Sequence, residues 1–310
     1  MPKQMLAEIT DGAVVRTLAY LKQKKLIPYK GKPGAFLALT LADRTGTIEA
    51  KVFDGAEEVA AGLKEGDIIS VAGRASVYQG TLGVILDNIT LWEGEVDKGD
   101  YMRAYSGDVE ELIAGFEKLL ASITDPDLAQ ILQGIFADKE TRAKYFDAPA
   151  AMTVHGAYLH GLLEHVVRQA ELAETACRLY PLANRDLVIA GVLLHDIGKL
   201  WEFSWDLSVS YTTPGKLIGH AVIADRLICE TGRELGVDEE KALQLRHLIL
   251  SHHGTRDFGA VVLPQMLEAV ILHSVDNLEA KANRCQELLS NGTGEWTEFD
   301  NIEKHAWYRG

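Results

Sequence analysis

Seven histidine and aspartate side chains in the second half of the chain have the residue types and spacing of a metal site. They are His165, His195, Asp196, His220, His252, His253 and Asp276. His195-Asp196 follows the apolar run 187–193, where two polar side chains cost stability unless something pairs with them. His252-His253 is a second adjacent pair, and each of the seven residues lies within or at the end of an expected helix.

Imidazole and carboxylate groups suit Mn, Fe, Co, Ni or Zn, and the absence of cysteine from the set argues against a structural zinc site. We expect two divalent ions, with Mn²⁺ as the first choice and Fe, Co or Ni as alternatives, bridged by the two oxygens of Asp196. The remaining ligands would be divided between the ions as His165, His195 and Asp276, then His220, His252 and His253. Such a pair of ions generates a nucleophile from water and stabilises charge on a phosphate. For any single histidine, a hydrogen-bonded core residue is the alternative.

Helices are expected to position these residues. One long helix is predicted from His155 to Tyr180, and a second, capped by Asn184, runs into His195-Asp196. Three further helices are predicted to carry the remaining ligands: one after Pro214-Gly215, one from Asp238 to His253, and one from Pro264. His160 is five residues before His165, on a different helix face, and is interpreted as a non-ligand.

The first third of the chain has the alternation of β-strands. Strands are predicted at 14–21, 36–41, 47–53, 68–78 and 81–86, with a helix at about 55–63. This is the element order of a five-stranded OB barrel. The stretches Gly34–Gly46 and Ile48–Lys51 resemble OB domains of the tRNA-anticodon-binding type.

OB barrels often bind single-stranded nucleic acid through a basic groove with stacking aromatic side chains. The candidates for such contacts are Lys22, Lys24, Lys25, Lys30 and Lys32, with Tyr29, Phe36 and Tyr78. The alternatives are that the lysines form a solvated loop and that the aromatic side chains belong to the barrel core.

The chain is therefore expected to be a multidomain α and β protein. The predicted parts are an OB-fold nucleic-acid-binding domain at 1–95, a helical linker at 96–150, an all-α metal-dependent domain at 151–290 and a tail at 291–310. Residues 1–95 carry 11 Lys+Arg and 12 Asp+Glu, so −13 of the net charge of −14 falls on residues 96–310. Indiscriminate binding to nucleic acid is not expected from this balance.

Nothing in the sequence predicts a membrane protein or an exported one. No apolar run approaches the roughly 18 residues of a membrane span, and the N-terminus lacks the pattern of a signal peptide. The three cysteines are scattered and form no CxxC pair, which is typical of reduced thiols. A cytoplasmic location is expected, and the sequence leaves open whether the chain forms a homo-oligomer.

The pattern His165…His195-Asp196…His220…His252-His253…Asp276 resembles the bimetal version of the HD-domain phosphohydrolases. This resemblance implies a helical fold, divalent metals and hydrolysis of a phosphoester, with Asp196 at the catalytic centre. It also matches Lys199 to a lysine that contacts the scissile phosphate in related enzymes. The alternative for Lys199 is a charge that suits the C-terminus of a helix.

An OB barrel followed by an HD domain resembles the YhaM family of 3′→5′ exoribonucleases. Further matching stretches are 161–165, 248–254, 273–281 and 296–299. One departure is visible, because the family often has two histidines where this chain has His155-Gly156. His155 stays a candidate substrate contact. Arg168 lies on the same helix face as His165, where it would hold a phosphate or pair with Glu164 or Glu171.

Three functions are weighed. The leading one is a metal-dependent 3′→5′ exonuclease that hydrolyses single-stranded RNA, with single-stranded DNA as a second substrate, to nucleoside 5′-monophosphates. The second is an HD-type phosphohydrolase of a small or cyclic nucleotide, although the Gly-Tyr-Pro motif of cyclic dinucleotide phosphodiesterases does not follow the histidine pair at 253–259. The third is a non-catalytic nucleic-acid-binding protein.

Overall fold

The computed structural model describes residues 4–31, 33–152, 156–290 and 292–310. The chain forms two compact units, and each is described by itself. The first contains the residues up to Arg103 together with Asp206–Ser208, and the second contains Ala104–Trp205 and Val209–Gly310. Among the described residues, no helix has the length and apolar character needed to cross a membrane.

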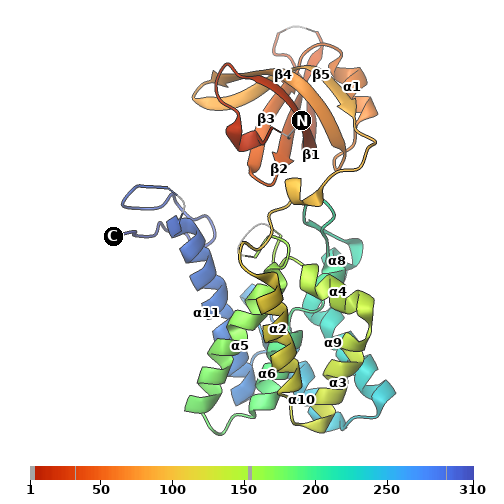
Figure 1. The fold of residues 1–310 in the computed structure, drawn as a ribbon, viewed down its shortest axis with the longest axis vertical. Helices are drawn as coiled ribbons and strands as arrows, with labels where there is room; N and C mark the ends of the chain where they lie inside the picture. Colours follow the sequence, from red (N-terminus) through yellow and green to blue (C-terminus); the bar gives the residue numbers. More distant parts are fainter. Residues whose placement is uncertain (1–3, 32, 153–155, 291) are drawn as a thin grey trace. The chain divides into compact units, whose positions relative to one another are not determined.

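The first unit is a closed five-stranded barrel, which confirms the predicted OB fold (Figure 1). Around the barrel the strands follow the order β1-β2-β3-β5-β4, with β3 and β5 parallel and the other pairs antiparallel. The elements are η1 (Leu6–Glu8), β1 (Val14–Pro28), β2 (Ala35–Asp43), β3 (Gly46–Val52), α1 (Ala56–Gly62), β4 (Ile68–Tyr78), β5 (Thr81–Leu91) and η2 (Lys98–Asp100).

Alternating side chains fill the barrel. Leu37, Leu39 and Leu41 of β2 are buried in its core, as the period of two predicts. Gly73 lies at the register shift between β4 and β5, where an added Cβ would come 2.1 Å from the carbonyl oxygen of Ile85. A side chain therefore does not fit at this bulge.

The second unit is helical, as predicted, apart from the short strands β6 (Phe203–Ser204) and β7 (Ser210–Tyr211). Its helices are α2 (Val109–Ala121), α3 (Pro126–Ala137), α4 (Lys139–Asp147), α5 (Gly161–Leu179), α6 (Arg185–Leu194), α7 (Lys199–Glu202), α8 (Thr213–Ile218), α9 (His220–Leu235), α10 (Glu239–Ser251), η3 (Arg256–Phe258) and α11 (Leu267–Ser290). The predicted start of α5 at residue 155 was wrong, because His160 precedes its first turn with a left-handed φ of 68°.

Helices α2, α3 and α4 pack into the core of the second unit, although we expected a linker at 96–150. Phe116, Phe136 and Tyr145 are buried there with ring centroids 5.1–5.3 Å apart. The Tyr145 hydroxyl donates a 2.7 Å hydrogen bond to the carbonyl oxygen of Leu193, near the end of α6. We propose that residues 104–150 belong to the metal-dependent domain, because they share its hydrophobic core.

The C-terminal residues fold back on α11, the long helix that lies alongside α5 (Figure 1). The Arg284 guanidinium donates to both oxygens of Asp300, at 2.7 and 2.5 Å. Arg309 donates to the carbonyl oxygens of Leu288 and Leu289, at 3.2 and 3.1 Å. These bonds attach residues 292–310, which we call the tail, to the last turns of α11.

Candidate metal centre and nucleic-acid interface

Five helices bring the seven predicted ligands together in the second unit. His165 lies on α5, His195 and Asp196 follow α6, His220 begins α9, His252 and His253 follow α10, and Asp276 lies on α11. Two groups result, within each of which the ligand atoms lie within 4.8 Å of one another: His165, His195 and Asp276, and His220, His252 and His253. These are the two groups that the sequence predicted.

Asp196 lies between the two groups and directs one carboxylate oxygen at each. Its Oδ2 is 3.3 Å from Nε2 of His195 and 3.8 Å from Nε2 of His165. Its Oδ1 is 3.4 Å from Nε2 of His220 and 3.9 Å from Nε2 of His252. The side chain is only 3% exposed, so these contacts take the place of water. This is the arrangement that a bridging carboxylate requires.

Two glycines allow the chain to approach itself at the centre. At Gly198 an added Cβ would lie 2.0 Å from the carbonyl oxygen of His220, so the turn after Asp196 comes this close to α9 because it lacks a side chain. Gly254 has a φ of +75°, and its Cβ would lie 2.2 Å from the ring of His273. The glycine residues in His195–Lys199 and His252–Gly254 therefore have a steric explanation.

Backbone carbonyl groups orient two of the imidazoles. Nδ1 of His195 donates to the carbonyl oxygen of Val192 at 2.9 Å, and Nδ1 of His252 donates to that of Ile249 at 2.6 Å. Because a carbonyl oxygen can only accept, Nδ1 carries the proton and the lone pair lies on Nε2. Among the described residues, the buried Nε2 of His195 has no hydrogen-bond partner. A cation fits this orphaned lone pair.

Carboxylates orient two more of the five imidazoles, and sequence reasoning missed both carboxylates. Nδ1 of His220 donates to the carboxylate of Glu202, at 3.0 and 3.1 Å from its two oxygens. Nδ1 of His165 donates to Glu279, which is 5% exposed. Nε2 of His220 then faces Nε2 of His252 at 3.4 Å, two lone pairs that a cation between them would satisfy. Outer carboxylates of this kind fix ligating histidines in metal sites.

Gln169, one turn after His165 on α5, is a further residue that the sequence did not single out. Its amide nitrogen lies 2.8 Å from Nε2 of His165 and donates to Oδ1 of Asp276 at 2.7 Å. The spacing of four residues from a predicted ligand was the available signal, because such pairs share a helix face. The Gln169 side chain therefore contacts two members of the first ligand group, His165 and Asp276.

The ammonium group of Lys199 contacts the carboxylate of Asp196. It donates to Oδ2 of Asp196 and to the carbonyl oxygen of Ala150, both at 2.6 Å. Burial alone would raise the pKa of Asp196, but Lys199 and then His195 hold that pKa well below its usual range. Asp196 is therefore ionised and ready to bind a cation. The contact of Lys199 with a scissile phosphate stays a proposal.

The histidines differ in charge according to their neighbours. Burial first, and His253 second, lower the pKa of His252 well below its usual value, so its imidazole is neutral. Burial alone would also lower the pKa of His165, but hydrogen bonds with Asp276 and Glu279 raise it to about 10. A metal ion would displace that proton, because imidazole ligates metals in its neutral form.

Two substrate contacts were predicted near α5, at Arg168 and His155. Arg168 pairs with Glu164 at 2.6 Å, which is the ion pair that the sequence offered as the alternative to a phosphate contact. His155 lies outside the described residues. His160, interpreted as a non-ligand, contacts the carbonyl oxygen of Phe146 through Nδ1 at 2.8 Å.

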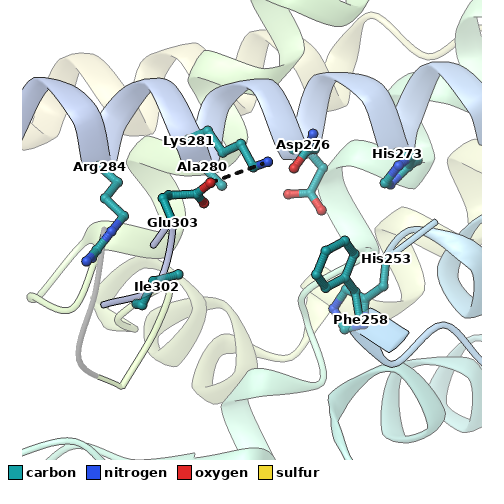
Figure 2. Close-up of a pocket in the computed structure, with 10 residues that line it drawn as sticks. His253, Phe258, His273, Asp276, Ala280, Lys281, Arg284, Ile302 and Glu303 are labelled. Atoms are coloured by element: carbon teal, nitrogen blue, oxygen red, sulfur yellow. Dashed lines mark ion pairs between the residues drawn. The ribbon is translucent and has the colours of Figure 1, made fainter. Parts of the chain in front are cut away.

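A pocket of about 410 Å³ adjoins the metal centre (Figure 2). One member of each ligand group, Asp276 and His253, lies in its wall. The remaining wall comes from α11, from Phe258 of η3 and from Ile302 and Glu303 of the tail. A substrate group bound at the metals would therefore extend into this pocket.

The barrel has a groove of its own, with a volume of about 710 Å³. Tyr29 and Phe36 lie in its wall with ring centroids 5.8 Å apart, and they are half-buried rather than part of the barrel core. Phe53 and Tyr78 lie there too, 42% and 68% exposed, and Nζ of Lys51 is 5.6 Å from the centroid of Tyr78. Exposed rings beside a lysine suit stacked bases and a phosphate backbone.

The predicted lysine cluster does not line this groove as a group. Lys24 lies within β1, which runs on to Pro28, and its ammonium donates to the carbonyl oxygens of Ala60 and Leu63 at the end of α1. Lys30 is exposed in the turn after β1, outside the groove wall, and Lys32 lies outside the described residues. Lys51, on β3, was missed because its strand alternates like any half-buried one.

Comparisons with known proteins agree with this division. Residues 162–281 match the family model described as an HD domain, and residues 15–92 match the one described as an OB-fold nucleic acid binding domain. The 3′-5′ exoribonuclease YhaM of Geobacillus sp. (strain WCH70) is 37% identical over 289 residues, covering 92% of this chain and 88% of the relative. The 3′-5′ exoribonuclease YhaM of Bacillus subtilis (strain 168) is 36% identical over 313 residues, covering 100% and 98%. A third relative with that name, from Halalkalibacterium halodurans, is 33% identical and covers 92% and 89%.

Proposed function

The chain belongs to the YhaM family of 3′-5′ exoribonucleases, and on that premise we propose that its two His/Asp groups hold the two metal ions of the reaction. It is a metal-dependent 3′-5′ exoribonuclease with an HD domain, which implies dependence on divalent metal. Its OB-fold domain binds nucleic acid. The seven ligands, the identity of the metal and the preference for RNA are the parts that we propose.

One observation supports the metal assignment most strongly. The two oxygens of Asp196 face different groups of ligands, at 3.3 Å from His195 and 3.4 Å from His220. A single buried carboxylate is then shared by two sites whose other members are histidines and one aspartate. When bound, two divalent ions generate a nucleophile from water and neutralise charge on the phosphate. A mixed set of imidazoles and carboxylates accepts Mn²⁺ as well as Fe, Co or Ni, and Mn²⁺ is the metal that we propose.

The side chains of this protein prepare the site for that chemistry. Glu279 and Glu202 hold the rings of His165 and His220 with Nε2 directed inward. Lys199 keeps the shared carboxylate of Asp196 ionised and fixed in position. Because His165, His220 and Asp196 are held by these hydrogen bonds before substrate binds, these side chains need little reorganisation around the reacting phosphate.

In this proposal, the OB barrel binds the single-stranded nucleic acid. Phe53 and Tyr78 would stack on bases, and Lys51 beside them would contact a phosphate. Stacking of this kind tolerates any base sequence, which suits an enzyme that shortens a strand one nucleotide at a time. Single-stranded RNA is the proposed substrate, with single-stranded DNA as the weaker one.

The test is to incubate the purified chain and Mn²⁺ with a 5′-labelled single-stranded RNA. We expect a ladder that shortens from the 3′ end, together with release of nucleoside 5′-monophosphates. Asp196→Asn should abolish the ladder, whereas Asp87→Asn, the same change on an exposed residue of β5, should leave it unchanged. Internal cuts, or hydrolysis of free nucleotides without shortening of the strand, would refute the proposal and favour a small-nucleotide phosphohydrolase.

A further inference from the structure

The pocket beside the metal centre has two chemically different sides. Figure 2 shows Phe258 and Glu303 on opposite sides, with Asp276 between them on α11. Phe258 is 72% exposed, so its ring is accessible to a ligand in the pocket. Glu303 is half-buried, and its carboxylate lies 3.6 Å from Nζ of Lys281 (Figure 2).

The two sides match the two parts of a nucleoside. An exposed aromatic face stacks on any base, and a carboxylate accepts hydrogen bonds from the hydroxyl groups of a ribose. The volume of about 410 Å³ lies near the lower end of ligand pockets, which run from about 300 to 1,000 Å³. This size suits one nucleotide rather than a length of strand.

The tail holds Glu303 in this position. Asp300, whose side chain is fully buried, accepts two hydrogen bonds from Arg284 of α11 and a third from the backbone N–H of Ile302 at 2.8 Å. Glu303 is thus three residues from a fixed anchor. A carboxylate carried by an anchored segment can select between substrates, because its position does not depend on the substrate.

We propose that this pocket receives the 3′-terminal nucleotide and that Glu303 accepts hydrogen bonds from its 2′- and 3′-hydroxyl groups, so that the tail selects a ribonucleotide end. This inference rests on the proposed function, because the phosphate of that nucleotide is placed at the metal ligands Asp276 and His253. Phe258 stacks on the base, and Lys281 keeps the carboxylate directed into the pocket. The 2′-hydroxyl group is what distinguishes RNA from DNA at a given site.

A purely structural reading of Lys281 and Glu303 is an ion pair that holds the tail to α11. Their side chains are 48% and 20% exposed, and an exposed pair of this kind contributes little to stability. The two interpretations predict different ratios of activity on substrates with and without a 2′-hydroxyl group. A structural pair affects folding and all substrates alike, whereas a hydroxyl acceptor changes the ratio between substrates that differ at the 2′ position.

The experiment compares two 5′-labelled single-stranded RNAs that differ only in a 2′-deoxy group on the 3′-terminal nucleotide. We expect kcat/KM for removal of that nucleotide to favour the ribose end by about tenfold or more, as for a hydrogen bond to a charged group. Glu303→Gln and Glu303→Ala should bring the ratio toward one. Glu298→Gln, the same change at an exposed tail residue outside the pocket, should keep the ratio of the unmodified chain.

A second measurement separates this inference from the proposed function. Calorimetry with Mn²⁺ present should show that AMP binds the unmodified chain about tenfold or more tightly than 2′-deoxy-AMP, with a smaller difference in Glu303→Ala. Equal ratios in all variants, or no preference in the unmodified chain, would overturn the role of Glu303. If neither RNA is shortened from its 3′ end, the proposed function fails, and the AMP comparison still decides whether Glu303 reads the 2′-hydroxyl group.

Discussion

Replacing Asp196 with asparagine tests whether one carboxylate joins the two groups of metal ligands. The amide keeps the volume of the side chain but offers one neutral oxygen, and its other end presents N–H donors. In the structure those two ends face His195 at 3.3 Å and His220 at 3.4 Å. One group would therefore face an amide nitrogen and the other a weak ligand. We expect Asp196→Asn to lose both ions.

The size of the effect follows from linkage. An ion present at about 100 times its Kd stabilises the folded chain by about 2.7 kcal/mol, so two ions contribute about 5 kcal/mol. For a unit of roughly 200 residues, 1 kcal/mol shifts Tm by about 2–4 °C. Mn²⁺ should therefore raise Tm by roughly 10–20 °C in the unmodified chain and by very little in Asp196→Asn.

The variant should also be less stable without metal. Lys199 lies 2.6 Å from Oδ2 of Asp196, and its side chain is only 15% exposed. Removing one partner of a buried ion pair costs about 3–5 kcal/mol, because the other charge stays buried. Scanning calorimetry of the metal-free protein should show this as a lower starting Tm, separate from the missing response to Mn²⁺.

Metal content per chain gives the decisive comparison. Elemental analysis after dialysis against Mn²⁺ should give two ions for the unmodified chain, none for Asp196→Asn and one for Asp276→Asn, whose carboxylate belongs to the first group alone. Asp87→Asn, an exposed change on the barrel, should keep both ions. If Asp196→Asn retains one tightly bound ion, the two groups do not share this carboxylate and the reasoning is refuted.

Three further predictions test the surroundings of the site. Glu279→Gln removes the carboxylate that orients His165 and should weaken Mn²⁺ binding at the first group by about 10–100-fold in a titration. Phe53→Ala should weaken binding of single-stranded RNA, measured by fluorescence anisotropy, by about 1–3 kcal/mol, the worth of one stacked base. Asp300→Asn leaves the Arg284 guanidinium without its carboxylate and should make the tail sensitive to limited proteolysis. The hydrogen bonds from Arg284 lower the pKa of Asp300, and burial opposes this shift only in part. The ion pair should therefore persist at pH values above the unfolded pKa of about 3.9 and weaken as the pH falls below it.

Matched controls make each of these predictions specific. Glu171→Gln, an exposed change on α5, should leave Mn²⁺ affinity unchanged, and equal loss in both glutamine variants would contradict the role of Glu279. Val14→Ala removes an apolar side chain that is 57% exposed and lies outside the groove wall, so it should not affect RNA binding. A tail that resists protease equally in Asp300→Asn and Glu298→Gln would show that the Arg284 pair does not hold it.

The fold and the ligand set were accessible from the sequence for a physical reason. Strands and helices have hydrophobic periods of 2 and 3.6 residues, and the order of the elements along the chain, which is that of an OB barrel, followed from those periods. The ligands were accessible because His195-Asp196 at the end of an apolar helix is costly without a partner. The seven residues lie together as expected, while their binding of metal stays a prediction for the experiments above.

Other contacts could not be predicted because they join residues that are far apart in the chain and have common types. Glu202 and Glu279 look like ordinary helix charges until the fold places them behind histidines. Lys24 looked like part of a basic patch, but the length of β1 carries it to the carbonyl groups at the end of α1. Spacing along the chain reports which residues share an element and not which element will pack against it.

Substrate choice is hard to predict from the sequence because it depends on which elements pack together, and spacing along the chain does not report this. The proposed metal ligands account for hydrolysis of a phosphodiester, but they do not specify the sugar that carries it. The groups proposed to contact the base and the sugar lie on η3 and on the tail, and neither segment has a periodic pattern in the sequence. Glu303 reaches the pocket because Asp300 is buried against Arg284, so selection of the sugar depends on a contact at the edge of the fold. Changes in the tail should therefore alter which 3′ ends are removed without emptying the metal site.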